Sequence, residues 1–106
     1  MSKSWLSFEA RVRGLATYLY GRPCLPKNVG GVDVDGVIEL DDETIILIEI
    51  TERCDLAKVR EDVGKLQTAR SALWAGSGIQ ARCWCVIDGP VTSSMAEAGN
   101  RNCSPG

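Results

Sequence analysis

One acidic residue inside an apolar run constrains this chain more than any other feature. Residues 44–51 read Thr-Ile-Ile-Leu-Ile-Glu-Ile-Thr, and such a nearly continuous apolar run is typical of a strand covered on both faces. Glu49 interrupts the run. A carboxylate there would lose several kcal/mol of hydration unless a cation, a proton or hydrogen bonds replaced the water. The run therefore predicts a central strand in which Glu49 has a specific partner.

The preceding segment, residues 32–40, predicts a second strand that is half buried. Its residues alternate, so one face would carry Val32, Val34, Gly36, Ile38 and Leu40, and the other Asp33, Asp35, Val37 and Glu39. A tight acidic turn centred on Asp42 would join the two strands and place Asp35 opposite Glu49. Directly opposed side chains lie about 5 Å apart. Because two carboxylates at that distance repel each other, we expect a positive charge between them.

The composition is that of an ordinary globular domain. The chain has 106 residues, of which 44% are hydrophobic and 25% are charged. It contains no apolar run of about 18 residues and no leader of basic residues followed by apolar ones, which predicts neither a membrane span nor a signal peptide. A cytoplasmic location follows as the default expectation.

The cysteines and the absence of histidine exclude several kinds of site. The five cysteines, at positions 24, 54, 83, 85 and 103, form no CxxC pair, and their spacing does not fit a zinc site. We expect structural thiols. With no histidine in the sequence, the chain cannot build Ser–His or Cys–His nucleophilic machinery by itself.

Charge is divided unevenly along the chain. Residues 1–30 carry a net charge of +4, residues 31–52 a net charge of −8, and the remainder +2. An acidic centre between basic flanks is compatible with a metal site beside a polyanion. It is equally compatible with ordinary charge pairing, so the charge pattern alone does not select a nucleic-acid partner.

Helical periodicity precedes the acidic hairpin. Ser4 or Ser7 can cap a first helix that ends at Gly21 and Pro23. Its expected apolar face consists of Trp5, Phe8, Val12, Leu15 and Leu19. Glu9 lies at the edge of that face, while Arg11 and Arg13 are expected to point elsewhere. The prolines in residues 23–29 predict a short, irregular edge strand.

A second helix is predicted after the hairpin. Asp55 is its expected cap, and glycines at positions 76 and 78 mark its end. The expected buried face consists of Leu56, Val59, Val63, Leu66 and Leu73. Lys58, Asp62 and Lys65 form another row, which would overlook the end of the hairpin. Residues 79–87 then predict a further buried strand, and the tryptophans at positions 5, 74 and 84 are expected in the core.

These elements predict an α/β fold with three layers, in which helices cover both faces of a small mixed sheet. The order is αβββαβ plus a short C-terminal helix around residues 95–98. The crossover through the second helix would make its two flanking strands parallel. We expect a domain over residues 1–99 and a flexible tail over residues 100–106, with the domain working alongside or fused to others.

This arrangement resembles the PD-(D/E)XK nuclease superfamily, whose restriction-endonuclease-like fold includes Holliday-junction resolvases and Mrr-type enzymes. The likeness covers about residues 5–88. Those domains carry an acidic residue at the start of the second strand, a Glu-x-Lys on the third, and often a glutamate in the first helix. Asp35, Glu49 and Glu9 stand at the matching positions, whereas Thr51 occupies the position of the lysine.

The resemblance implies a metal-dependent nuclease acting on nucleic acid, with DNA as the expected substrate. Asp35, Glu49 and the carbonyl of Ile50 would hold one or two Mg²⁺ or Mn²⁺ ions. Lys58 or Lys65 would take the role vacated at Thr51, and Gln67 would be close to substrate. A homodimer is compatible with such an enzyme.

Each of these assignments has a simpler alternative. Asp35 could occupy an exposed strand position or shape a turn with Gly36, and Glu9 could serve only the helix N-terminus, which favours acids. Glu61 and Lys65 could form an ordinary ion pair at a spacing of four residues. Asp33, opposite Thr51, is expected to be solvated or to support the site from outside it. The functional alternative is a domain of this fold that has lost catalysis and binds nucleic acid or protein.

Overall fold

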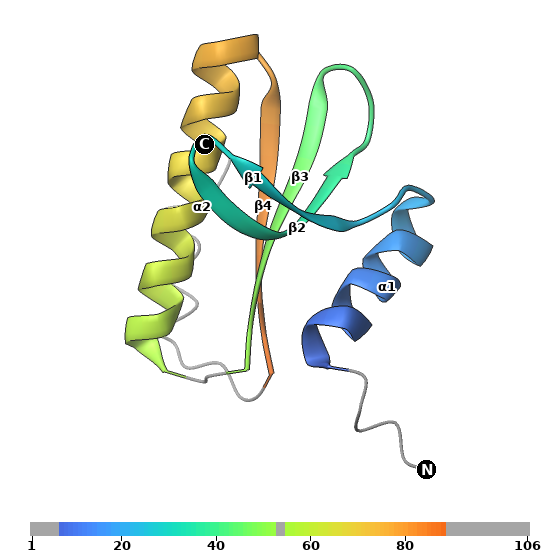
Figure 1. Ribbon diagram of the computed structural model, residues 1–106, viewed down its shortest axis with the longest axis vertical. Helices are drawn as coiled ribbons and strands as arrows, with labels where there is room; N and C mark the ends of the chain where they lie inside the picture. The colour runs from blue at the N-terminus through green and yellow to red at the C-terminus, as the bar shows by residue number, and fades with distance from the viewer. Residues whose placement is uncertain (1–6, 53–54, 89–106) are drawn as a thin grey trace.

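The computed structural model describes residues 7–52 and 55–88, which form two helices and four strands (Figure 1). In chain order these are α1 (Phe8–Tyr20), β1 (Leu25–Val29), β2 (Val32–Glu39), β3 (Thr44–Thr51), α2 (Leu56–Ser77) and β4 (Gln80–Ile87). The predicted α/β fold with the order αβββαβ is therefore confirmed. The short C-terminal helix, the tail and Trp5 lie outside the described residues.

The strands form one mixed sheet in the order β1-β2-β3-β4. β1 pairs with β2, and β2 with β3, in antiparallel fashion. β4 runs parallel to β3, as a crossover through α2 requires. In the β2–β3 hairpin Ile38 pairs with Ile46, and Gly36 pairs with Ile48. This is the register predicted from a turn centred on Asp42.

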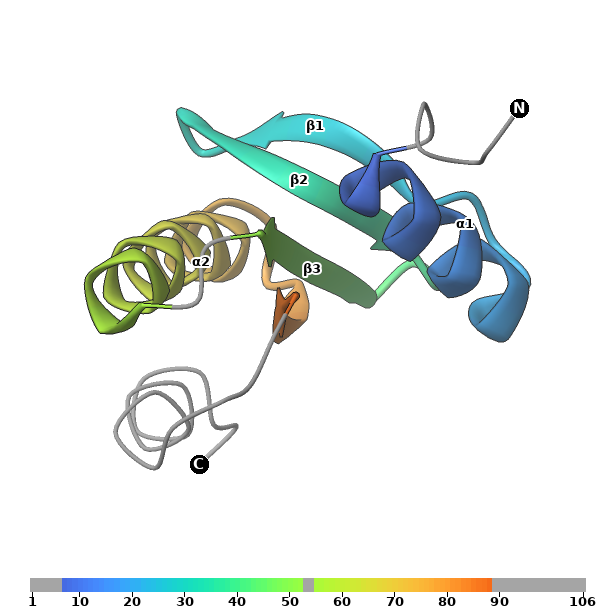
Figure 2. The same ribbon diagram turned by 90° about the horizontal axis from the view of Figure 1, so that it is seen from below.

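The two helices cover opposite faces of the sheet (Figure 2). On β3, the side chains of Ile46, Ile48 and Ile50 belong to the cluster that packs against α1. The intervening Ile45 and Leu47 belong to the cluster that packs against α2. Both faces of β3 are thus buried, which explains the continuous apolar run in its sequence. Alternation then directs Glu49 to the α2 face.

Helix α2 begins and ends where its cap residues predict. The Asp55 side chain accepts a hydrogen bond of 2.8 Å from the Lys58 backbone N–H, and Gly78 adopts a left-handed conformation at the C-terminus. The buried positions of the helix are Val59, Asp62, Val63, Leu66 and Ala69. The predicted apolar face is correct over its central residues, and Asp62 is buried beside it.

The predicted face of α1 is wrong in its second half. Leu15 and Leu19 are 59% and 66% exposed. The helix instead packs through Phe8, Val12, Ala16 and Tyr20, which recur at intervals of four residues. The predicted face and the observed face share Phe8 and Val12, so only packing against the sheet selects between them.

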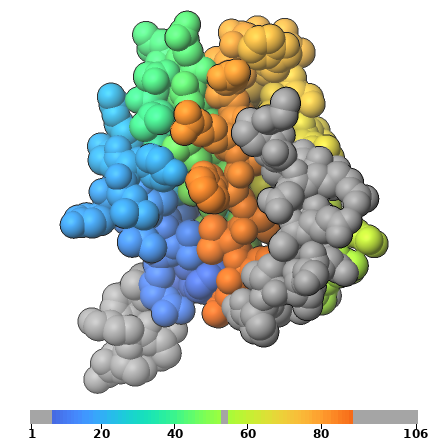
Figure 3. All heavy atoms as spheres, turned by 180° about the vertical axis from the view of Figure 1, so that it is seen from behind, coloured from blue at the N-terminus to red at the C-terminus, as the bar shows by residue number. Residues whose placement is uncertain are grey.

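Strand β4 and the two described tryptophans are also less buried than predicted. Trp74 and Trp84 are 63% and 53% exposed, so their assignment to the core is wrong. β4 is an edge strand, and its residues are either exposed or only partly buried. Its atoms reach the molecular surface in Figure 3. Neither described helix is long and apolar enough to cross a membrane.

Candidate functional site

A bulge in β2 sets the position of Asp35. β1 advances two residues between Leu25 and Lys27, while β2 advances three between their partners Val37 and Val34. The predicted strict alternation of β2 is therefore wrong at this point. Val34 and Val37 both pack in the cluster under α2. An inserted residue of this kind changes the direction of the neighbouring side chains, and such bulges are frequent next to active sites.

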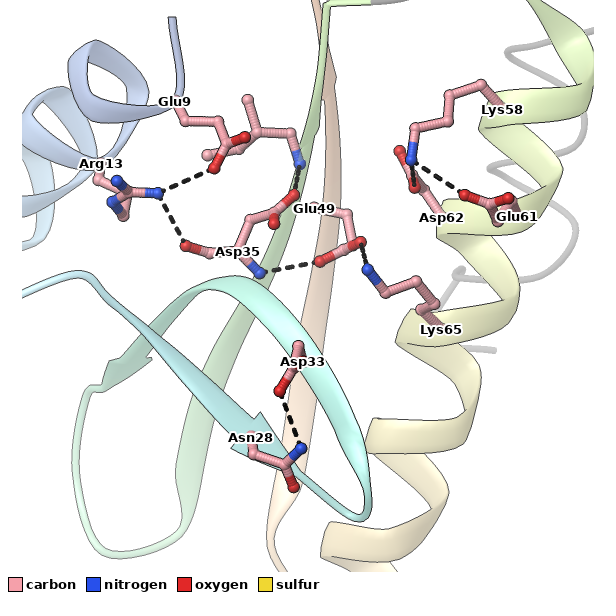
Figure 4. A network of polar contacts seen from close by, with 11 residues as sticks. Glu9, Arg13, Asn28, Asp33, Asp35, Glu49, Lys58, Glu61, Asp62 and Lys65 are labelled. Atoms are coloured by element: carbon pink, nitrogen blue, oxygen red, sulfur yellow. Dashed lines mark hydrogen bonds and ion pairs between the residues drawn. The ribbon is translucent and has the colours of Figure 1, made fainter. Parts of the chain in front are cut away.

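Asp35 and Glu49 are joined by two reciprocal hydrogen bonds (Figure 4). The backbone N–H of Asp35 donates to Oε2 of Glu49 over 2.9 Å. The backbone N–H of Ile50 donates to Oδ2 of Asp35 over 2.8 Å. The backbone pairing between β2 and β3 ends at Gly36 and Ile48. Beyond that pair, the two carboxylates accept the hydrogen bonds that backbone carbonyls would otherwise accept. The structure therefore brings Asp35 and Glu49 together, through contacts of each carboxylate with the backbone of the other strand.

Glu49 is fully buried and lies against a lysine. Nζ of Lys65 is 2.8 Å from Oε1 of Glu49. The Lys65 ammonium is therefore the counter-ion of this buried carboxylate. Burial raises the pKa of the Glu49 carboxyl, and the Lys65 ammonium and the Asp35 N–H offset only part of that rise. Burial acts to lower the pKa of Lys65, but the carboxylates of Glu49, Asp35 and Asp62 together outweigh it, so the net shift is upward.

The other candidate lysine, Lys58, pairs with a different buried carboxylate, Asp62. Its ammonium donates to Oδ1 of Asp62 over 2.9 Å and to Oε1 of Glu61 over 3.1 Å. Hydrogen bonding to Asp62 is the main reason that the pKa of Lys58 is raised. The structure therefore brings Lys65, and not Lys58, to the paired carboxylates. Glu61 pairs with Lys58, so the alternative of an ordinary Glu61–Lys65 pair is not what the structure shows.

Arg13 is a site residue that the sequence analysis missed. Its Nη1 lies 3.2 Å from Oε1 of Glu9 and donates over 3.2 Å to the backbone carbonyl of Asp35. The expectation that Arg13 points elsewhere is therefore wrong. Glu9 reaches the site region only through Arg13, and its side chain is 44% exposed. The spacing of four residues between Glu9 and Arg13 is the signal that would have indicated this pair.

Three further residues of the sequence analysis, Thr51, Asp33 and Gln67, differ in their position relative to Asp35 and Glu49. Thr51, at the position of the family lysine, is 3% exposed. Asp33 is exposed and accepts a hydrogen bond from Asn28 over 2.9 Å, in agreement with its predicted place outside the site. Gln67 is exposed, and because it follows Lys65 by two residues it does not share the side of α2 that faces Glu49.

The donor set suits a cation that keeps most of its waters. Among residues 7–52 and 55–88, no three histidine, cysteine or acidic residues cluster closely enough to enclose a metal ion. Asp35 and Glu49 offer two carboxylates, and Mg²⁺ is commonly bound by one or two carboxylates plus water. The N–H of Ile50 points at Asp35, and its carbonyl projects from the same edge of the strand. A cation bound here would compete with Lys65 for the Glu49 carboxylate.

Comparison of the chain with protein-family models, curated protein sequences and solved structures gives no significant match. The resemblance to the PD-(D/E)XK superfamily therefore stays a prediction from the order of the elements and the positions of the carboxylates. What the chain does has to be argued from its own geometry.

Proposed function

We propose that this chain is a divalent-metal-dependent nuclease that hydrolyses phosphodiester bonds, with DNA as the expected substrate. The observation that supports the proposal is the fully buried carboxylate of Glu49, which accepts from the Asp35 N–H and pairs with Lys65 beside a second carboxylate, Asp35. Burying charged groups together in this way costs desolvation free energy, and such costs are concentrated at functional sites. We also expect a cytoplasmic location and, where both strands are cut, a homodimer.

The carboxylates and the carbonyl of Ile50 would hold Mg²⁺ or Mn²⁺. Each carboxylate uses one oxygen for the hydrogen bonds that join Asp35 to the β3 backbone and Glu49 to the β2 backbone. These bonds hold both side chains in place, so Asp35 and Glu49 would be the carboxylates that hold the cation. When bound, the cation would supply Lewis acidity toward the phosphodiester.

Two basic side chains flank this pair and would contact the substrate phosphate. Lys65 approaches Glu49 from α2, and Arg13 approaches Asp35 from α1 (Figure 4). In this proposal the Lys65 ammonium offsets the phosphate charge, a role that the buried hydroxyl of Thr51 cannot fill. Arg13 holds the carbonyl of Asp35 and thereby supports the bulge that positions the carboxylate.

Plasmid nicking tests the proposal. Wild-type protein should nick supercoiled DNA with Mg²⁺ or Mn²⁺ and not with EDTA. Loss of the Glu49 ligand in Glu49→Gln should reduce the rate by about 100-fold or more, because even residues that only support a metal ligand commonly contribute 10- to 100-fold. Glu39→Gln is the matched control on the same hairpin, since Glu39 is 68% exposed and pairs only with Lys27 on the surface. Full activity in Glu49→Gln would refute the proposal.

A second candidate function is binding without cleavage. It is favoured by the threonine at the position of the family lysine and by the ion pair that already neutralises Glu49 in this structure. A domain of this kind would bind nucleic acid or protein independently of metal. DNA binding that persists in EDTA and in Glu49→Gln, with no nicking by the wild type, would support this alternative.

A further inference from the structure

Asp62 has a feature that its pairing with Lys58 does not explain. Its side chain is fully buried, and while Oδ1 accepts a hydrogen bond from Lys58, Oδ2 has no hydrogen-bond partner. Glu49 Oε1, by contrast, lies 2.8 Å from the Lys65 ammonium. Leaving a buried acceptor unsatisfied costs about 1–3 kcal/mol. The unpartnered oxygen of Asp62 therefore requires an explanation.

Lys65 is the side chain that relates these two oxygens. It contacts Glu49 directly and follows Asp62 by three residues, a spacing that makes the two neighbours on the helix surface. The negative charge of Asp62 helps to raise the pKa of Lys65, which places the ammonium within the field of both carboxylates. A lysine side chain is flexible and carries three donors, so it can exchange acceptors without moving the backbone.

We propose that Lys65 is an exchangeable counter-ion, which pairs with Glu49 before a divalent cation binds and moves to Oδ2 of Asp62 when the cation takes Oε1 of Glu49. This inference rests on the proposed metal site. A divalent cation at Glu49 would repel the adjacent ammonium, and this repulsion favours the departure of Lys65 from that carboxylate. Asp62 offers a buried negative acceptor one helical turn away, which keeps the ammonium beside the site with its other N–H donors available to the substrate phosphate.

The role assigned to Asp62 is therefore that of a positioning residue. Lys58 occupies Oδ1 of Asp62, so Oδ2 is the acceptor that is left for Lys65. The three residues occupy the row on α2 that faces the hairpin (Figure 4). Breaking the exchange should weaken metal binding, because Lys65 would then remain as a competitor for Glu49.

Mn²⁺ binding measured by isothermal titration calorimetry in a double-mutant cycle tests this inference. Asp62→Asn should weaken Mn²⁺ binding about 10-fold in the presence of Lys65, a coupling within the range usual between linked sites. Lys65→Met removes the competitor and should tighten binding. In the Lys65→Met background, Asp62→Asn should change the affinity by no more than about twofold.

Two further variants complete the test. Glu61→Gln is the matched control for charge, because Glu61 also contacts Lys58 but is 66% exposed, and it should leave Mn²⁺ affinity unchanged. If Asp62→Asn does not fold by circular dichroism, Lys58→Met replaces it. That variant should tighten Mn²⁺ binding by making both oxygens of Asp62 available to Lys65, and the effect should vanish in Lys65→Met.

The outcomes separate this inference from the proposed function. Equal weakening by Asp62→Asn with and without Lys65 would overturn the exchange and leave the metal site standing. Absence of Mn²⁺ binding that depends on Glu49 would overturn both. Coupled binding without DNA cleavage would support the exchange and refute the nuclease.

Discussion

Replacing Lys65 with methionine removes the positive charge that lies 2.8 Å from the buried Glu49 carboxylate. Breaking a fully buried ion pair by deleting one partner costs about 3–5 kcal/mol. The cost should be smaller here, because the Lys65 side chain is 33% exposed and Glu49 keeps the hydrogen bond from Asp35. We expect a loss of about 2 kcal/mol in the free energy of unfolding at pH 8, which corresponds to a drop of about 8–16 °C in Tm.

The size of this loss should depend on pH. Burial already raises the pKa of Glu49, and Lys65 counteracts that rise, so Lys65→Met should raise the pKa further. A carboxyl whose pKa is higher in the folded state favours folding at low pH, and it loses that contribution as pH rises through the raised value. The difference between Lys65→Met and the wild type should therefore be small near pH 5 and grow toward pH 8.

Urea unfolding at pH 5 and pH 8 measures both effects. Glu49→Gln in the same molecule should abolish the cost of Lys65→Met, because no buried charge is then left unpaired. Lys27→Met is the matched control, since it breaks an exposed pair with Glu39 and should change stability by less than about 0.5 kcal/mol. A loss that is equal at both pH values, or that persists with Glu49→Gln, would refute this reasoning.

Two further predictions concern the scaffold that holds the site. Gly30→Ala should destabilise the fold by about 2–4 kcal/mol in urea unfolding, because Gly30 has a φ of +61° and an added Cβ would collide with Ala72 on α2. Gly31→Ala, with a φ of +85° and open space around it, should cost only the backbone strain of about 1–2 kcal/mol, and equal losses at the two positions would contradict the packing argument. Asp55→Ala should cost about 0.5–2 kcal/mol by removing the cap that accepts from Lys58 N–H, and an unchanged urea midpoint would show that the cap contributes nothing.

The location of the site could be predicted from the sequence because its main elements are defined by local patterns. A charged residue in an apolar run marked Glu49, and the acidic turn set the hairpin register that brought Asp35 to it. The row of Lys58, Asp62 and Lys65 followed from helical spacing alone. These inferences depend only on residues within the same helix or hairpin.

The contacts inside the site could not be predicted in the same way. The bulge at Asp35 depends on how β2 pairs with β1, where Pro26 has no N–H to donate. Arg13 reaches Asp35 because the sheet selects one of two apolar rows on α1 as the packed face. In both cases the contact is decided by a residue in another helix or strand, so a local sequence pattern does not predict it.

The sequence by itself determined the order of the elements, the buried central strand and the meeting of two acids in one hairpin. Periodicity and turn chemistry are properties of short segments, and they suffice for those features. Only the tertiary structure decided that Lys65 pairs with Glu49, that Lys58 pairs with Asp62, and that Oδ2 of Asp62 has no hydrogen-bond partner. Those choices depend on the depth and angle at which α2 packs on the sheet, which are set by the whole core at once.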